Sequence, residues 1–324
     1  MIDIQTNDTK MKEILRLVDS VASSRSSVLV QGEPSTGKNS LAKLVHQKSN
    51  RNQSPCVIVN CAQQPEMLLE TELFGFEKGA FAGTVSEKRG KFEQAHNGTI
   101  ILDDVSELSL KLQAKLLRVL ENATVERLGA TTAIPIDVRV VSVTNKNLAD
   151  LVSQGRFNEA LYFRLNNVTI TMPPVRERTA DIKGLVSTMM GRISTRTGRR
   201  VSGITEEAVE KLSTHDFPNN LRELESILER AMMSANDGVI RALDITVGQV
   251  NPATHQGSGA HSIDWETQAQ WAPGRTLDEI ERAVILKSLA YHNGNRTHTA
   301  RELGISIRTL RNKLNEYRRV GIDV

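Results

Sequence analysis

The spacing of apolar residues divides the first part of the chain into alternating helices and strands. Residues 8–23 repeat apolar side chains every three or four positions, which predicts an amphipathic helix. Short apolar runs typical of buried strands follow at residues 27–31, 55–61, 98–105, 136–144 and 168–172. Helical spacing separates them at residues 39–48 and 109–122. Because strands that alternate with helices favour a parallel sheet, we expect an α/β domain over residues 1–173.

The remainder of the chain is predicted to be helical. Helical spacing at residues 181–195, 205–215 and 220–236 predicts a small all-α subdomain over residues 174–249. Residues 250–275 are polar and rich in Gly and Ser, which predicts a flexible linker. Three further helices, at residues 276–292, 296–303 and 306–318, predict a C-terminal domain over residues 276–324.

A phosphate-binding pattern, G-x-x-x-x-G-K, stands between the first strand and the helix that follows it. The residues are Gly32, Glu33, Pro34, Ser35, Thr36, Gly37, Lys38 and Asn39. Glycines let backbone N–H groups turn toward phosphate oxygens, and Lys38 would neutralise the β- and γ-phosphates of ATP. The position after Lys38 usually carries a Ser or Thr that holds Mg²⁺, and here it is Asn39. The alternative is an ordinary glycine-rich turn.

Polar residues at the ends of two later strands add to this pattern. Asp103 and Asp104 follow three apolar residues, so Asp103 is expected to hold Mg²⁺ through water and Asp104 to polarise the attacking water. Asn145 follows the strand at 136–144 and can orient that water. Arg164 and Arg222 are candidate phosphate contacts. Taken one at a time, the acids could begin a helix and the arginines could lie on the surface.

Positive charge is concentrated near the C-terminus, although the whole chain has a formal net charge of only +3. Residues 293–319 contain seven Lys or Arg and two Glu, and their helices have helix-turn-helix spacing around Gly304. The second of these helices would present Arg308, Thr309, Arg311, Asn312 and Lys313 to DNA. The alternative is a plain three-helix bundle that mediates oligomerisation.

No apolar run approaches the roughly 20 residues that span a bilayer, and the first residues do not have the pattern of a signal peptide. We therefore expect a cytoplasmic protein with no membrane partner.

Residues 8–248 resemble the AAA+ domain of bacterial enhancer-binding proteins, the nitrogen-regulator type of activator of sigma-54 RNA polymerase. The most specific segments are residues 60–62, 72–75, 79–84, 113–121 and 220–224. The C-terminal helices resemble the Fis-type domain that ends many of these activators and binds DNA.

The resemblance implies a ring, usually a hexamer, that binds ATP between subunits. Asn60 resembles the asparagine that links the catalytic carboxylate to the sigma-contacting loop, Asn145 resembles sensor I, and Arg222 resembles sensor II. Arg164 resembles an arginine finger that reaches the nucleotide of a neighbouring subunit. The residues that would contact sigma-54 are Gly79, Ala80, Phe81, Ala82, Gly83 and Thr84.

Several positions depart from the family pattern. Where the family usually has glutamate, this chain has Asn39 and Asp104. Asn158 replaces the first finger arginine, and Ala82 replaces the contact threonine of the sigma-54 loop. Two hypotheses follow. The first is an activator that remodels the closed polymerase complex by hydrolysing ATP. The second is a DNA-binding co-activator or regulator with impaired ATPase activity, which acts with a partner subunit or independently of sigma-54. Because few residues precede residue 8, we expect control to come from a separate protein that binds the ATPase domain or from the level of expression.

Overall fold

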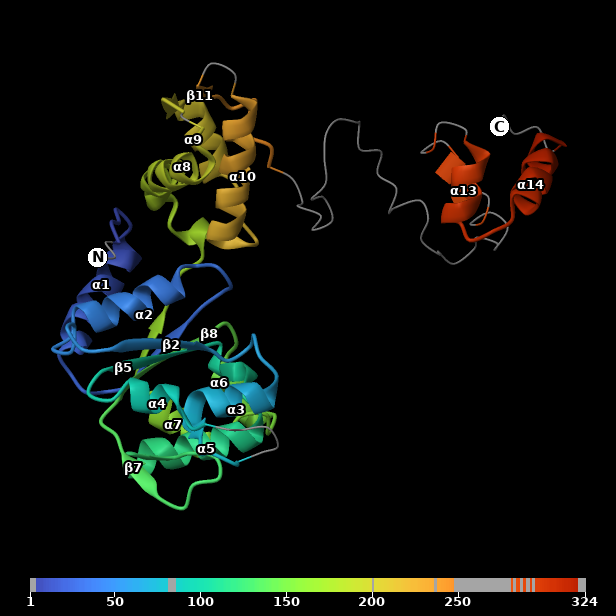
Figure 1. Cartoon of the computed structure of the whole chain (residues 1–324). Helices are drawn as coiled ribbons and strands as arrows, with labels where there is room; N and C mark the ends of the chain where they lie inside the picture. The colour runs from blue at the N-terminus through green and yellow to red at the C-terminus, as the bar shows by residue number, and fades with distance from the viewer. Residues whose placement is uncertain are drawn as a thin grey trace. The chain divides into compact units, whose positions relative to one another are not determined.

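The computed structural model describes residues 4–80, 86–199, 201–235, 238–247, 281, 284–285, 288–289, 292 and 295–319 (Figure 1). The chain forms two compact units, Met1–Gln249 and Val250–Val324.

The first unit is built on a parallel sheet of five strands, as the sequence predicts. The strands are β1 (Val28–Gln31), β2 (Cys56–Asn60), β5 (Thr99–Asp103), β8 (Arg139–Thr144) and β9 (Val168–Thr171). Their order is β2-β5-β8-β1-β9, and every neighbouring pair is parallel. Because all five strands run in one direction, the residues that follow them gather at one edge.

Helices cover both faces of this sheet (Figure 1). One face packs against α1 (Thr9–Ala22) and α2 (Lys38–Gln47), and the other against α3 (Glu66–Phe74), α4 (Lys91–Gln94), α5 (Leu110–Asn122), α6 (Leu148–Ser153) and α7 (Glu159–Leu165). Side chains alternate between the two cores along β1, where Leu29 joins one core and Val28 and Val30 join the other. The fold class is therefore the expected α/β arrangement.

Two short antiparallel hairpins interrupt the α/β pattern and are absent from the sequence-based prediction. One pairs β3 (Gly75–Phe76) with β4 (Lys88–Arg89), and the other pairs β6 (Thr124–Glu126) with β7 (Ala133–Pro135). Gly75 and Gly90 approach so closely that a Cβ on Gly75 would lie 2.6 Å from the Gly90 nitrogen. The first hairpin therefore needs glycine at its base.

A helical lid follows the sheet within the same unit. The 3₁₀ turns η2 (Val175–Glu177) and η3 (Thr179–Asp181) lead into α8 (Ile182–Thr197), α9 (Glu206–Ser213) and α10 (Asn220–Ser234). Two-residue strands β10 (Gly203–Ile204) and β11 (Val239–Ile240) pair in parallel at the end of this bundle. Its core includes fully buried Phe217, Leu224 and Leu228. The all-α subdomain is thus present, with a short strand pair added.

The second unit contains α13 (Arg296–Glu302) and α14 (Ile307–Arg319). Ala300 and Leu310 pack with Ile285, Leu314 and Tyr317 in its core. Gly304 has φ +66° between the two helices, and Ser306 Oγ accepts a hydrogen bond from the Thr309 nitrogen at 3.0 Å. The turn expected around Gly304 is therefore present, and Ser306 caps the second helix. Among the described residues, no helix is both long and apolar enough to span a membrane.

Candidate functional site

The carboxyl edge of the sheet brings together most of the predicted nucleotide-site residues. Gln31, the last residue of β1, pairs with Thr144 of β8, and Asn60 pairs with Asp103 across β2 and β5. One edge of the sheet therefore brings together the residues after β1, at the end of β5 and after β8. This is the position where ligands bind in open α/β sheets.

Two glycines shape the loop that follows β1. Gly37 has φ +100° at the point where α2 begins, a conformation that side-chain-bearing residues rarely adopt. A Cβ on Gly32 would lie 2.7 Å from the carbonyl oxygen of Met172. The Thr36 hydroxyl donates to the Glu33 carbonyl at 3.0 Å and closes the loop on itself. The glycine spacing of the motif is therefore a requirement of this backbone path.

Lys38 folds into this loop. Its Nζ donates to the carbonyl oxygens of Gly32 at 2.8 Å and Glu33 at 2.6 Å. Burial lowers the pKa of Lys38, and the nearby Asp104, Asp103 and Glu33 oppose that shift. The first N–H groups of α2 have no partner within the helix, so this end also favours an anion. A cation and a helix N-terminus at one loop fit a phosphate group.

Two amides hold the first acidic residue. Asn39 Nδ2 donates to Asp103 Oδ2 at 2.7 Å, and Asn60 Nδ2 lies 3.5 Å from the same oxygen. The resemblance links Asn60 to the catalytic carboxylate, expected at Asp104, whereas the structure places its amide at Asp103. Carboxylate and amide oxygens are hard donors that suit Mg²⁺, so Asp103 and Asn39 fit that ion. The contact between Asn39 and Asp103 was not part of the sequence-based prediction.

Asp104 occupies a different environment from Asp103. Its backbone is left-handed, with φ +54°, immediately after β5. Burial and then the neighbouring Asp103 raise the pKa of Asp104, which strengthens it as a proton acceptor. Asn145 directly follows β8 and is exposed. The two residues expected to handle the attacking water thus follow adjacent strands, β5 and β8.

Arg222 lies in the first turn of α10, whose beginning contacts the phosphate loop. The Leu221 nitrogen donates to the Ser35 carbonyl at 3.0 Å. The Arg222 side chain is exposed. The lid therefore brings its candidate phosphate contact beside the loop that would hold the phosphates.

Arg164 lies far from these residues. Its Nη2 donates to the Leu120 carbonyl at 2.8 Å, and its own carbonyl accepts from the Ser27 hydroxyl at 2.6 Å. Ser27 precedes β1, whereas the phosphate loop follows β1, so four strand residues separate the two sites. At about 3.3 Å per residue, that separation is roughly 13 Å. Arg164 is thus remote from the phosphate site of its own subunit.

Asn158 stands where the family has its first finger arginine, and the structure gives it a local role. Its Oδ1 accepts from the Leu161 nitrogen at 3.0 Å and caps α7, the helix that carries Arg164. Its own nitrogen donates to Gln113 Oε1 at 2.7 Å. An arginine has no acceptor and could not make this cap.

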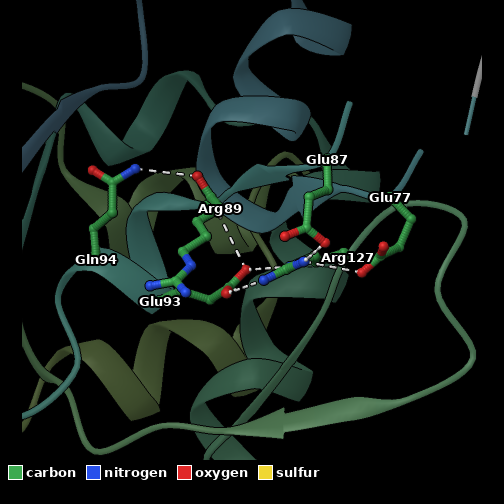
Figure 2. Close-up of polar contacts among 7 residues, drawn as sticks. Glu77, Glu87, Arg89, Glu93, Gln94 and Arg127 are labelled. Atoms are coloured by element: carbon green, nitrogen blue, oxygen red, sulfur yellow. Dashed lines mark hydrogen bonds and ion pairs between the residues drawn. The ribbon is translucent and has the colours of Figure 1, made fainter. Parts of the chain in front are cut away.

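One arginine holds the base of the hairpin that carries the expected sigma-54 contacts (Figure 2). Arg127 donates to both oxygens of Glu93, at 2.8 and 2.7 Å, and to Glu77 at 3.0 Å and Glu87 at 2.9 Å. Glu77 and Glu87 stand on either side of the loop, so one guanidinium joins its two ends. Its hydrogen bonds lower the pKa of the Glu93 carboxyl.

Backbone contacts reinforce this base. The Glu77 nitrogen donates to the Leu128 carbonyl and the Leu128 nitrogen to the Gly75 carbonyl, each at 3.0 Å. Of the expected contact residues, Gly79 and Ala80 are described, whereas Phe81, Ala82, Gly83 and Thr84 lie outside the described residues. No local pattern in the sequence indicates this role of Arg127, because its three partners lie 34 to 50 positions away.

The candidate DNA-binding residues lie along α14 of the second unit. Arg308, Thr309, Arg311 and Asn312 are exposed. Lys313 is partly buried, and its Nζ pairs with Glu281 Oε2 at 2.6 Å. Four of the five residues thus lie on the surface of the helix, and the fifth also makes a contact inside its own unit.

Known proteins share all three parts of this architecture. Residues 4–171 match the sigma-54 interaction domain, residues 176–260 the AAA+ ATPase lid domain, and residues 276–317 the Fis family of bacterial regulatory proteins. The transcriptional regulatory protein FlbD of Caulobacter vibrioides is 40% identical over 98% of this chain and 70% of its own length. The regulatory protein AtoC of Escherichia coli is 38% identical over 99% of this chain and 68% of its own length.

Solved structures agree with these relatives. The structure of NtrX from Brucella abortus in complex with ADP has a TM-score of 0.71 and 27% identity over 98% of this chain and 69% of that one. NtrX in complex with ATP gives a TM-score of 0.70 at the same identity, over 97% and 69% of the two chains. The chain therefore belongs to the bacterial sigma-54-dependent transcriptional activators, with an AAA+ domain, its lid and a Fis-family helix-turn-helix.

Proposed function

We propose that the chain binds ATP with Mg²⁺ at the carboxyl edge of its sheet and that adjacent subunits of a ring, a hexamer by resemblance, hydrolyse it together. The observation that carries this proposal is the position of Arg164. Its carbonyl contacts Ser27 at the amino edge, whereas Lys38 lies at the carboxyl edge. Because this position is remote from the phosphate site of its own subunit, any nucleotide that Arg164 contacts would belong to a neighbouring subunit.

The residues of the carboxyl edge have separate roles in binding and hydrolysis of ATP. Lys38 and the N-terminus of α2 hold the phosphates. Asp103 with Asn39 would hold the metal ion, which would stabilise the charge that develops in phosphoryl transfer. Asp104 polarises the attacking water, which Asn145 orients. Arg222 approaches the phosphates from the lid, and Arg164 of the next subunit completes the site.

The loop at residues 79–84 would carry the result of hydrolysis to sigma-54. Its base is fixed by Arg127, so movement of the surrounding domain reaches the loop through a rigid stem. Ala82 lacks the hydroxyl of the family threonine, so we expect weak contact with sigma-54. Ala82→Thr should then increase sigma-54 binding, and an unchanged affinity would count against a role for this position.

The second unit would direct the ring to DNA. Arg308, Arg311 and Asn312 suit base edges in the major groove, and Thr309 and Lys313 suit phosphates. This DNA site would lie upstream of the promoter, as the family resemblance implies.

A second candidate is a subunit that binds ATP but hydrolyses it slowly without a more complete partner. Asn158 is uncharged and caps α7, so it supplies no positive charge to the nucleotide of a neighbour. Asp104 is one methylene shorter than the usual glutamate, and displacements near 1 Å can cost on the order of 100-fold in rate. Such a subunit would act as a co-activator, in a mixed ring or with a separate regulatory protein.

Mixing two inactive variants tests the shared site. Lys38→Ala should lose nucleotide binding, and Arg164→Ala should lose hydrolysis while it still binds ATP. In a mixture, a Lys38→Ala subunit can lend Arg164 to an Arg164→Ala neighbour, so ATPase activity should return. No recovery in rings shown to be mixed would refute hydrolysis between subunits. Slow hydrolysis by the unmutated chain, relieved by a partner activator, would favour the second candidate.

A further inference from the structure

Three consecutive residues of the phosphate loop bind the lid. Glu33 accepts two hydrogen bonds from Arg176, at 2.9 and 2.5 Å, and a third from Asn220 Nδ2 at 3.1 Å. The same Asn220 nitrogen lies 3.1 Å from the Pro34 carbonyl, and the Leu221 nitrogen donates to the Ser35 carbonyl. The lid is therefore joined directly to the loop that would hold the nucleotide.

Glu33 also contacts the nucleotide side of the loop through its backbone. Its carbonyl oxygen accepts from Lys38 Nζ at 2.6 Å and from the Thr36 hydroxyl at 3.0 Å. One residue thus bonds to the phosphate-binding lysine through its main chain and to the lid through its side chain.

Asn220 connects this contact to the beginning of α10. The residue is fully buried and has φ +50° at the beginning of the helix, and its Oδ1 accepts from the Val175 nitrogen at 2.8 Å. Both ends of its amide are therefore fixed by hydrogen bonds. Arg222 follows two residues later, in the first turn of α10, so its distance from the phosphate loop depends on this anchor.

The contact between Glu33 and Arg176 is stronger than an ordinary surface pair. Each side chain is 39% exposed, and exposed pairs usually contribute little. Here the arginine binds both carboxylate oxygens, and the Asn220 amide adds a third hydrogen bond. The hydrogen bonds from Arg176 and Asn220 lower the pKa of Glu33 to about 2, so the carboxylate is ionised near neutral pH.

A buried arginine contacts the same loop at a second position. Arg178 is 3% exposed, and its Nη2 donates to the Thr36 carbonyl at 2.6 Å. Arg176 and Arg178 stand two residues apart in the first segment of the lid. This segment therefore forms hydrogen bonds with the phosphate loop at both Glu33 and Thr36.

We propose that Glu33 is a positioning residue, through which the nucleotide bound by Lys38 sets where the lid holds Arg222. The inference rests on the proposed nucleotide site and adds a route from that site to the lid. When Lys38 binds phosphate, it gives up its bonds to the carbonyls of Gly32 and Glu33. The Glu33 carbonyl then keeps only its hydrogen bond from the Thr36 hydroxyl, so the Glu33 backbone can shift. The carboxylate of the same residue moves with it and changes the position of the lid. A triphosphate and a diphosphate would therefore favour different lid positions.

The test measures how the full-length chain distinguishes two fluorescent nucleotides in the presence of Mg²⁺. The probes are mant-ADP and a non-hydrolysable mant-ATP analogue. In Glu33→Gln and in Arg176→Met, the ratio of the triphosphate affinity to the diphosphate affinity should fall about fivefold or more. The double variant should show the same fall as either single variant, because both remove one interaction.

Glu177→Gln is the matched control. It breaks an equally short pair, between Lys10 Nζ and Glu177 Oε2 at 2.8 Å, one residue beyond Arg176 and away from the phosphate loop. Its affinity ratio should equal that of the unmutated chain. If Glu33→Gln does not fold, Arg176→Met and Arg176→Lys test the same contact from the lid.

The outcomes separate this inference from the proposed function. A lower melting temperature with an unchanged affinity ratio would mean that the contact only stabilises the fold, and would overturn the inference. If the unmutated chain binds neither probe, the nucleotide site itself is refuted. If it binds both probes and the Arg176 variants retain the full ratio, the nucleotide site stands and the route through Glu33 is refuted.

Discussion

Asn39 Nδ2 donates a hydrogen bond of 2.7 Å to Oδ2 of Asp103, so the residue that replaces the family glutamate is joined to the expected metal-binding carboxylate. An amide in this place donates to Asp103, whereas a glutamate would add a third negative charge beside Asp103 and Asp104. The substitution therefore changes how the carboxylate is held, and it keeps an oxygen available to a metal ion.

We expect Asn39→Leu to weaken Mg²⁺ binding in the presence of nucleotide by about tenfold. The change removes a hydrogen bond to a charged group, and such bonds contribute roughly 1.5–3 kcal/mol. A Mg²⁺ titration of nucleotide fluorescence measures the effect. Asn50→Leu is the control, since it removes an exposed amide beyond the other end of α2. Equal Mg²⁺ affinities in both variants would refute a role for the contact between Asn39 and Asp103.

Replacing Asn158 by the family arginine should lower the free energy of unfolding, whatever its effect on catalysis. Loss of an N-cap costs about 1 kcal/mol, so Asn158→Arg and Asn158→Ala should each reduce the free energy of unfolding by that amount. Asn158→Asp keeps a capping oxygen and should remain close to the unmutated chain. Urea denaturation measures all three variants. A fully stable Asn158→Ala would show that the cap is dispensable.

Arg127→Met should destabilise the hairpin base far more than its position near the surface suggests. Glu93 is 9% exposed at its side chain, and removal of its partner leaves a buried charge uncompensated. Breaking a buried pair costs about 3–5 kcal/mol, and we expect a loss near the lower limit, with faster proteolysis between residues 77 and 87. Arg196→Met is the control, because Arg196 also binds two glutamates but its side chain is 56% exposed. Similar losses in both variants would contradict the special role of Arg127.

The contribution of Glu33 to stability should depend on pH. Its pKa falls from 4.5 to about 2 in the folded chain, so its stabilising effect is complete above pH 4.5 and is lost as the pH falls toward 2. The melting temperatures of the unmutated chain and of Glu33→Gln should therefore differ most near neutral pH and converge in acid. Calorimetry between pH 3 and about 7 measures the difference. A gap that stays constant across this range would show that ionisation of Glu33 is not its cause.

Arg311→Ala should weaken specific DNA binding by about tenfold, since a base contact in the major groove contributes roughly 1–3 kcal/mol. Lys313→Ala should weaken binding less, because Lys313 also pairs with Glu281. Its effect should be similar across DNA sequences, because a phosphate contact does not read the bases. Footprinting on a site selected from random DNA by the unmutated chain compares the two variants. An unchanged footprint with Arg311→Ala would refute the placement of α14 in the groove.

The fold and the nucleotide edge could be predicted from the sequence because both depend on local signals. Buried strands such as Thr99–Asp103 are continuous apolar runs, and Gly37 and Lys38 lie at fixed spacing after one of them. The contacts of Arg127 and Glu33 could not be predicted in this way. Arg127 reaches partners brought near by two-residue strands, and Glu33 reaches Arg176 across 143 positions. The Asn158 cap was a missed local signal, because an asparagine before a short helix is a usual capping residue.

The position of Arg164 at the amino edge of the sheet has a genetic consequence. In a ring that shares its sites between neighbours, a subunit that loses both Lys38 and Arg164 disables two sites: its own and the one it faces. A cell that carries one damaged and one intact copy of the gene would then lose more activity than the number of damaged subunits suggests. Such alleles are expected to be dominant, because a shared site works only when both of the subunits that form it are intact.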